Sequence, residues 1–350
     1  MGATAMIAAL TVLVAYSDHI HPEGHTFLAC IGMAYPFFLM AMVILLLIWL
    51  MVSWKRAWLP LLALIIVIPA TRVYFPVHFK STPPPGCIKI VSYNVGGYTI
   101  NAHHADPLDA IAKYLEQQQA DIVCLQEDMT TKYKSVERYD SIYPYNDTVH
   151  VNKPGHLLIN ALGIHTRYPI LYKERICYES FANGSVAFFL LIDGDTVVVV
   201  NNHLESTHLS HGDRQRYTDI LYGEHDSTNV QAETRFLVGK LATNMTKRAA
   251  QAEAVSHYVD SVKSRYPVIL CGDFNDTPIS YVRRTVAKGL TDCYVETGIG
   301  AGVSFNMRGF RFRIDQMMCS DHFKPYSCYV DDKIEDSDHY PVICWLEKKR

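Results

Sequence analysis

The chain has 350 residues, of which 49% are hydrophobic, 32 are Lys or Arg and 35 are Asp or Glu. Residues 1–80 carry six charged side chains, whereas residues 81–350 carry 28 basic and 33 acidic ones and a formal net charge of −5. This mildly acidic balance argues against a nonspecific nucleic-acid binder, which needs a large basic excess, although a local basic groove remains compatible with it.

The first 80 residues have the pattern of a membrane anchor. Residues 26–53 contain no charged side chain, and this length exceeds the roughly 20 apolar residues that a helix needs to cross a bilayer. Residues 57–71 are a second uncharged stretch and residues 1–17 a third, shorter one. A signal peptide fits residues 1–17 poorly, because no basic segment precedes them and an apolar span follows at once. We therefore predict a transmembrane anchor of two to three helices over residues 1–80.

The orientation of this anchor follows from the charges in its short loops. Lys55 and Arg56 lie between the apolar stretches 26–53 and 57–71, which predicts that this turn faces the cytoplasm. The chain is then an integral membrane protein whose remaining residues are extracytoplasmic, although Arg72 and Lys80 weaken this signal. Residues 81–86, Ser-Thr-Pro-Pro-Pro-Gly, are typical of a stiff linker and mark the boundary to a domain over residues 87–350.

The second part of the chain has an α/β pattern. Short runs rich in apolar and β-branched residues predict strands at residues 88–95, 121–125, 186–192, 196–201, 268–271 and 342–346. Apolar residues at helical spacing predict helices at residues 106–119 and 231–264. These elements favour layered sheets flanked by helices. Among the nine cysteines, no CxxC pair indicates a zinc ribbon. Cys319 and Cys328 are candidates for a disulfide in an oxidising compartment, but sequence alone cannot pair them.

Six polar clusters lie at or just past the ends of predicted strands. They are residues 92–94, 125–127, 202–205, 272–275, 313–315 and 337–339. An isolated Asp or His beside a turn is normally a solvated or capping residue. Six such clusters in order instead indicate a site at one edge of a rigid scaffold.

Four of these clusters carry a specific resemblance. The strings Leu-Gln-Glu at 125–127, Gly-Asp-Phe-Asn at 272–275, Arg-Ile-Asp at 313–315 and Ser-Asp-His at 337–339 resemble those of the DNase I-like endonuclease/exonuclease/phosphatase superfamily. The resemblance covers residues 87–347. It implies a four-layer sandwich of two mixed β-sheets flanked by helices, and a metal-dependent phosphoric ester hydrolase.

The resemblance also implies a metal site. A hard cation neutralises phosphate charge and prefers oxygen ligands, so Mg²⁺ or Mn²⁺ is the expected cofactor. By resemblance, Glu127 is the principal ligand, while Asn94 and Asp338 support the metal or its water molecules.

The catalytic residues implied are His203, Asp273, Asn275, Asp315 and His339. Asp273 orients and deprotonates the attacking water with the help of Asn275, and His203 donates a hydrogen bond to a phosphate oxygen. Asp315 pairs with His339, which fixes the imidazole tautomer and raises its pKa. How the work divides between Asp273 and the Asp315–His339 pair stays open.

Structural interpretations compete with some of these roles. Asp273 and Asn275 are also typical of a turn, and Asp315 is a plausible salt-bridge partner of Arg313. Glu205 fits a surface residue. Three arginines form a basic stripe that either binds substrate phosphate or balances a solvated face: Arg308, Arg311 and Arg313.

Three functions remain open at this point. The anchor favours a phosphoesterase acting on a membrane-proximal phospholipid headgroup or on a sugar or inositol phosphate. The alternative is a nuclease or nucleic-acid end-processing enzyme, because residues 202–207, Asn-His-Leu-Glu-Ser-Thr, are similar to a segment of 5′-tyrosyl-DNA phosphodiesterases. Phe274 departs from that family, which has Thr there. The third is a non-catalytic binding protein, which the complete polar set disfavours. The bilayer is the expected partner of the N-terminal helices, and no protein partner is predicted.

Overall fold

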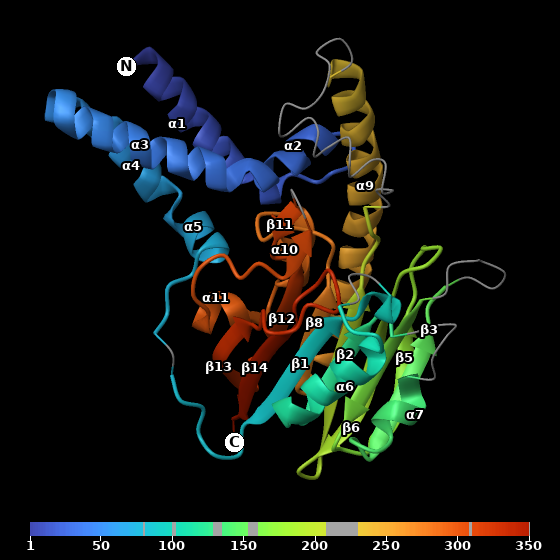
Figure 1. Cartoon of the computed structure of the whole chain (residues 1–350). Helices are drawn as coiled ribbons and strands as arrows, with labels where there is room; N and C mark the ends of the chain where they lie inside the picture. Colours follow the sequence, from blue (N-terminus) through green and yellow to red (C-terminus); the bar gives the residue numbers. More distant parts are fainter. Residues whose placement is uncertain are drawn as a thin grey trace.

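The computed structural model describes residues 1–79, 81–99, 103–128, 135–152, 160–207, 230–307 and 310–349. Figure 1 shows helices of the N-terminal region projecting from a body built on two sheets.

The N-terminal region is helical. Its α-helices are α1 (Gly2–Ala15), α2 (Thr26–Cys30), α3 (Tyr35–Ser53), α4 (Trp58–Ile66) and α5 (Ile68–Tyr74). Within the described residues, one helical stretch, Thr26–Arg56, is long and apolar enough to cross a membrane, with 31 residues and a mean hydropathy of 2.6 in its most apolar window. The predicted apolar stretch at residues 57–71 is divided at Val67, which separates α4 from α5. Pro69 lacks an N–H group, so it fits the first turn of the new helix α5, which begins at Ile68, and cannot continue the old helix.

The first sheet has six strands in the order β13-β14-β1-β2-β4-β3. Their bounds are β1 (Ile88–Asn94), β2 (Ile122–Gln126), β3 (Tyr145–His150), β4 (Ala161–Thr166), β13 (Phe323–Val330) and β14 (Val342–Lys348). β1 and β2 are parallel, and β14 is antiparallel to β1. The helices α6 (Pro107–Gln118) and α7 (Ser135–Tyr139) accompany this sheet, and the side chain of Asp106 caps the first turn of α6.

The second sheet has the order β5-β6-β7-β8-β12-β9. Its strands are β5 (Ile170–Ile176), β6 (Gly184–Ile192), β7 (Asp195–His203), β8 (Val268–Asp273), β9 (Thr291–Asp292) and β12 (Asp315–Cys319). β7 and β8 are parallel, whereas β12 is antiparallel to β8. The helices of this half are α9 (Val230–Val262), α10 (Tyr281–Val286) and α11 (Cys293–Thr297), and β10 (Phe305–Met307) pairs with β11 (Phe310–Phe312).

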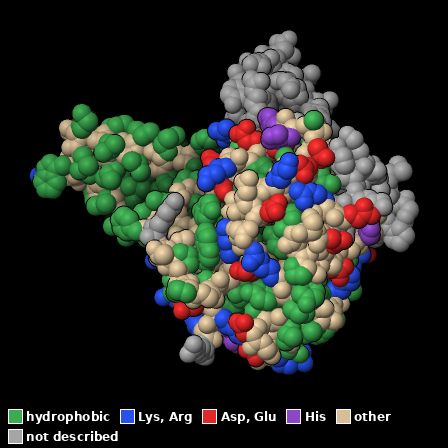
Figure 2. Space-filling view, turned by 60° about the horizontal axis from the view of Figure 1, so that its bottom comes forward, with side chains coloured by type: hydrophobic (Ala, Val, Ile, Leu, Met, Phe, Trp, Pro, Cys, Tyr) green, Lys and Arg blue, Asp and Glu red, His purple; other side chains and the backbone are tan. Residues whose placement is uncertain are grey.

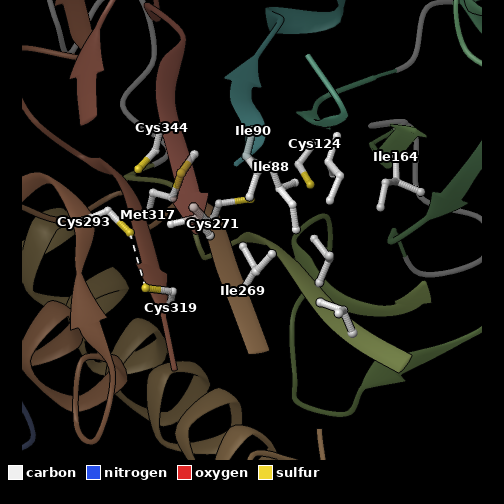
Figure 3. Close-up of a cluster of buried hydrophobic side chains, with 14 of the residues drawn as sticks. Ile88, Ile90, Cys124, Ile164, Ile269, Cys271, Cys293, Met317, Cys319 and Cys344 are labelled. Atoms are coloured by element: carbon white, nitrogen blue, oxygen red, sulfur yellow. Dashed lines mark hydrogen bonds between the residues drawn. The ribbon is translucent and has the colours of Figure 1, made fainter. Parts of the chain in front are cut away.

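The central core lies between the two sheets. Ile90 and Cys124 of the first sheet and Ile269, Cys271 and Met317 of the second are fully buried in one apolar cluster (Figure 3). A second cluster joins the other face of the second sheet to α9 and α10, and a third joins the first sheet to α6. The fold is therefore two mixed sheets flanked by helices, as the sequence predicts.

The cysteines are free thiols. All nine are free, so Cys319 and Cys328 form no disulfide, and Cys319 lies beside Cys293 with 3.9 Å between the two Sγ atoms. Most of them, including Cys124, Cys271 and Cys344, are buried, so they act as small apolar core residues.

The predicted strands and helices are confirmed, with one correction that matters for the site. The sequence predicts that Asp315 and the cluster at residues 337–339 each follow an apolar strand. In the structure Asp315 begins β12, and residues 337–339 precede β14. Both strands run antiparallel to their neighbours, so their beginnings lie at the same sheet edge as the carboxyl ends of β1 and β8.

Candidate active site

One edge of the two packed sheets collects the polar clusters. His203 at the end of β7 is the register partner of Asp273 at the end of β8, and Asp273 is the partner of Asp315 at the start of β12. In the other sheet, Asn94 ends β1 beside Gln126 at the end of β2. Strand pairing therefore brings residues together that are far apart in the sequence.

The carboxylate of Asp273 is the centre of this arrangement. Its Oδ2 accepts hydrogen bonds of 3.1 Å from Nδ2 of Asn94 and from Nδ2 of Asn275. Its Oδ1 accepts a bond of 2.7 Å from the backbone N–H of Asn275. The Nε2 atoms of His203 and His339 each lie 3.7 Å from Oδ2. Asn275 is thus more than a turn residue, because both its amide groups orient the Asp273 carboxylate.

The protonation of Asp273 is shifted by its surroundings. Burial is the main cause that raises the pKa of this carboxyl to about 6; the charge of Asp315 adds to the rise, and the two neighbouring imidazoles oppose it. A carboxylate with a pKa near neutrality can both accept and release a proton at ordinary pH.

His339 and Asp315 form a buried pair. Nδ1 of His339 lies 2.8 Å from Oδ2 of Asp315, and both side chains are nearly inaccessible to solvent. Burial by itself lowers the pKa of His339, but the charges of Asp315 and Asp273 outweigh it and raise that pKa to about 10. The partner of Asp315 is therefore His339, and the competing salt bridge to Arg313 is wrong.

The protonation state of His203 differs from that of His339. Burial lowers its pKa, which favours the neutral imidazole. Its Nδ1 lies 3.0 Å from Nδ2 of the buried Asn160, and its Nε2 lies 3.8 Å from Oε1 of Glu127. If the Asn160 amide donates to Nδ1, the proton of neutral His203 sits on Nε2, facing the centre of the site. Sequence reasoning missed Asn160, which immediately precedes β4.

Two site residues have unusual backbone conformations. Glu127 has φ of 55° and Asn275 has φ of 52°, in the left-handed region that side chains with a Cβ rarely adopt. Such strain persists where surrounding contacts impose it and is concentrated at functional sites. Gly272, just before Asp273, has φ of 131°, and a Cβ there would lie 2.0 Å from the backbone oxygen of Asn202. Only glycine allows β7 and β8 to approach so closely at this edge.

Comparison with known proteins agrees with this geometry. A model described as "Endonuclease/Exonuclease/phosphatase family" matches residues 91–339. The chain belongs to this family. A second model, "Domain of unknown function (DUF8431)", matches residues 1–74, and no curated protein sequence matches the chain.

Solved structures of the endonuclease/exonuclease/phosphatase fold are similar to the chain. TDP2 of D. rerio, complexed with a single strand DNA product, is 17% identical with a TM-score of 0.52, over 75% of this chain and 100% of that one. A family protein of Leptotrichia buccalis C-1013-b is 14% identical with a TM-score of 0.54, over 75% and 100% of the two chains. The human Nocturnin catalytic domain with bound sulfate is 14% identical with a TM-score of 0.52, over 78% and 97%. At these identities the likeness shows the fold alone.

The family site also offers donors for a metal. One ligand atom from each of Asp273, Asp315 and His339 lies within 4.8 Å of the others. This set differs from the predicted ligands, and Nδ1 of His339 is already engaged by Asp315. Nearby, Nδ2 of Asn94 donates to Oε1 of Glu127 at 3.3 Å. Several carboxylate and amide oxygens converging on one buried edge suit a hard divalent cation, whose charge would relieve the repulsion between them.

Asp338, the third predicted ligand, lies at this edge as well. It is 5% exposed, its backbone carbonyl accepts the N–H of Asn306, and its charge acts on His339. The neighbouring Ser337 donates to the carbonyl of Asn94 at 2.7 Å, which ties the segment before β14 to the end of β1. All eight predicted site residues therefore lie at the same edge of the family fold.

Two other expectations are corrected. Glu205 is not a surface residue: it is 1% exposed and accepts hydrogen bonds from Ser180 at 2.6 Å and Gln251 at 3.2 Å. Arg313 is buried and not part of a solvated stripe, whereas Arg311 is exposed and donates to Asn306. Arg308 lies outside the described residues.

Proposed function

We propose that this chain is a divalent-metal-dependent phosphoric ester hydrolase that acts on a membrane-proximal phospholipid headgroup or on a sugar or inositol phosphate. The observation that carries the proposal is the convergence of buried carboxylates and two imidazoles, in different protonation states, around the Asp273 carboxylate. Hydrolysis proceeds by in-line attack of a water molecule on phosphorus.

Asp273 is the proposed acceptor of the water proton. Its Oδ2 is fixed by Asn94 and Asn275, so the carboxylate is held in one orientation before substrate arrives. Its pKa of about 6 leaves it ionised at neutral pH yet basic enough to take a proton.

The two histidines stabilise the negative charge that develops on the substrate during the reaction. Neutral His203 donates from Nε2 to a non-bridging phosphate oxygen, where negative charge grows in the transition state. His339, which Asp315 holds in its protonated form, stabilises the developing charge or supplies a proton to the leaving oxygen. Asn275 helps by holding the Asp273 carboxylate through its side-chain and backbone amide groups.

Glu127, Asn94 and Asp338 are the proposed ligands of Mg²⁺ or Mn²⁺. When bound, such a cation neutralises phosphate charge and makes phosphorus more susceptible to attack. The structural support is the 3.3 Å contact between Asn94 and Glu127 at the same edge as the buried Asp338.

The N-terminal helices support a substrate at a membrane. Figure 2 shows a lobe covered almost entirely by hydrophobic side chains, beside a body of mixed charge. Its exposed apolar side chains include Phe37, Met40, Leu47 and Met51, whose exposed fractions lie between 55% and 88%. Burying this surface in lipid is strongly favourable. We propose that residues 1–80 anchor the protein as an integral membrane protein, with the turn at Lys55 and Arg56 in the cytoplasm and the catalytic domain outside.

A nucleic-acid end-processing phosphodiesterase is the second candidate. It is favoured by the segment around His203 and by the likeness of the fold to D. rerio TDP2 with its DNA product. The net charge of −5 over residues 81–350 weighs against it, because phosphate backbones are held mainly by cationic side chains.

The test uses the full chain in lipid nanodiscs with Mg²⁺. Substrates are phosphoinositide and sphingomyelin in the same bilayer, soluble inositol phosphates, 5′-phosphotyrosyl DNA and plasmid DNA. Asp273→Asn serves as the inactive control, because it keeps the side-chain shape and removes the base. We expect cleavage of a lipid or inositol phosphate that this substitution abolishes.

The alternatives give distinct results. Cleavage of 5′-phosphotyrosyl DNA or plasmid with no lipid turnover would replace the proposal by the nuclease function. Equal product from wild type and Asp273→Asn on every substrate would contradict a hydrolase at this site. Accessibility of the catalytic domain to protease in sealed right-side-out vesicles tests the orientation, and complete protection would refute it.

A further inference from the structure

Arg313 is buried at the junction between the N-terminal helices and the catalytic strands. It lies two residues before Asp315 and is 2% exposed. Its Nη1 donates to the carbonyl of Ala301 at 2.8 Å and more weakly to that of Tyr74 at 3.4 Å, and its Nη2 donates to the carbonyl of Val73. The guanidinium carbon lies 4.3 Å from the ring centroid of Tyr294.

The end of α5 therefore helps to compensate the buried charge of Arg313. Among the described residues no carboxylate lies within salt-bridge distance of this guanidinium, so backbone carbonyls and an aromatic face compensate it. The carbonyls of Val73 and Tyr74 belong to the last turn of α5, where the helix dipole favours a cation. A buried cation without such partners is strongly unfavourable. Arg313 and the end of α5 consequently hold each other in place.

This contact continues directly into the catalytic pair. The backbone N–H groups of Ile314 and Asp315 both donate to Oγ of Ser304 at 3.0 Å. Segment 313–315 is thus fixed at three successive residues, and Asp315 presents its carboxylate to His339 from the fixed end. A shift of Arg313 is transmitted to Asp315 through two peptide units.

The N-terminal helices contact a second catalytic segment. Ile279, which follows Asn275 closely, is 2% exposed within an apolar cluster formed with Val14, Tyr35, Ala70 and other residues of the N-terminal helices. Gly32 packs against this segment so closely that a Cβ there would lie 2.2 Å from the carbonyl oxygen of Ile279.

The chain after α5 stays on the catalytic domain. The N–H of Gly300 donates to the carbonyl of Pro76 at 2.8 Å, and the N–H of His78 donates to the carbonyl of Gly298 at 3.2 Å. Val77 forms an isolated antiparallel bridge with Ile299. In Figure 1 this segment passes beside α11. The loop that receives it also supplies the Ala301 carbonyl to Arg313.

We infer that Arg313 is a positioning residue, through which the N-terminal helices set the geometry of the Asp315–His339 pair. The helices are then a structural part of the active site as well as an anchor. This inference rests on the proposed catalytic roles of Asp315 and Asn275.

The test compares variants of the full chain in detergent micelles with bis(p-nitrophenyl) phosphate as a soluble substrate. Arg313→Met removes the donors, and Arg313→Lys keeps the charge but loses the planar fork. Gly32→Ala disturbs the Ile279 contact from within the N-terminal region. Arg167→Met is the matched control, because Arg167 is exposed and bonds Gln119.

We expect kcat to fall ten- to a hundredfold, on the order of what a small displacement of a catalytic group costs, in Arg313→Met with KM nearly unchanged. Arg313→Lys should recover part of the loss, and Gly32→Ala should lower kcat about three- to tenfold. Unchanged kcat in both Arg313→Lys and Gly32→Ala, with an active wild type, would overturn the inference about Arg313 and leave the proposed function standing. A rise in KM at constant kcat would also overturn it, because that marks substrate binding.

A second measurement does not depend on activity. A protease site is placed in the exposed segment 81–86, and the full chain is cut in micelles. The two parts should remain associated on gel filtration in wild type and Arg167→Met and separate in Arg313→Met. Retention in all three would overturn the role of Arg313 in joining them. If the wild type hydrolysed no substrate, the proposed function would fail, and this arm would still decide whether Arg313 links the two regions.

Discussion

Nδ1 of His339 lies 2.8 Å from Oδ2 of Asp315 across a gap of 24 residues in the sequence. β12 is antiparallel to β8 and β14 is antiparallel to β1, so the start of each strand reaches the edge where the parallel strands end. Asp315 and His339 therefore meet because β12 and β14 both run antiparallel to these neighbouring strands.

Replacing Asp315 by Asn tests this pair. The amide keeps the shape but removes the charge that holds the pKa of His339 near 10 despite burial. His339 then loses its proton more easily, and we expect kcat to fall about 10²- to 10⁴-fold, the usual contribution of a positioned acid or base. Steady-state kinetics with thermal melting as a folding control measure it. A kcat within twofold of wild type would contradict the role of Asp315.

Metal dependence is tested through Glu127. EDTA should abolish hydrolysis, and added Mg²⁺ should restore it. In Glu127→Gln one anionic ligand is lost, so the Mg²⁺ concentration for half-maximal activity should rise at least about tenfold. Glu116→Gln, on the exposed side of α6, is the matched control and should leave the titration unchanged. Overlapping Mg²⁺ curves for Glu127→Gln and wild type would exclude Glu127 as a ligand.

Asn160 is predicted to orient His203. Its amide lies 3.0 Å from Nδ1 of His203, so Asn160→Ala frees the imidazole to rotate or change tautomer. We expect kcat to decrease about tenfold, in line with the lower contribution of a group that acts through another. Gln119→Ala is the control, because its exposed amide, just after α6, bonds the backbone carbonyl of Glu116, and it should leave kcat unchanged. Equal kcat values for the two variants would show that His203 needs no such support.

Gly272 is predicted to be essential for stability. In Gly272→Ala the new Cβ would lie 2.0 Å from the backbone oxygen of Asn202. The alanine would also have to adopt φ of 131°, which a residue with a Cβ rarely does. We expect the free energy of unfolding to fall by at least about 3 kcal/mol. Gly194→Ala separates the two causes, because Gly194 also has positive φ but has no neighbouring atom within 4 Å, and it should cost about 1 kcal/mol. Denaturant unfolding measures both, and equal losses would refute the steric argument.

Some expectations failed because the sequence carries no local signal for them. Asn160 is a single polar residue between the apolar residues 157–159 and 161–162, so nothing in the sequence indicates that it lies against His203. Glu205 follows His203 as an ordinary charged residue would, and its burial depends on Ser180 and Gln251, which are distant in the sequence. Arg313 was interpreted as one residue of a basic stripe, because its carbonyl partners belong to a helix about 240 residues earlier.

The sequence by itself determined the strands at β1, β2, β7 and β8, the polar residues that follow them, and the apolar N-terminal helices. Those features are local: apolar runs bury themselves, and the residue after a buried strand is presented at a sheet edge. The tertiary structure decided the directions of β12 and β14, the partners of His203 and Asp315, and the contact between α5 and Arg313. These depend on strand pairing and on compensation of buried charge between distant segments, which spacing along the chain does not encode.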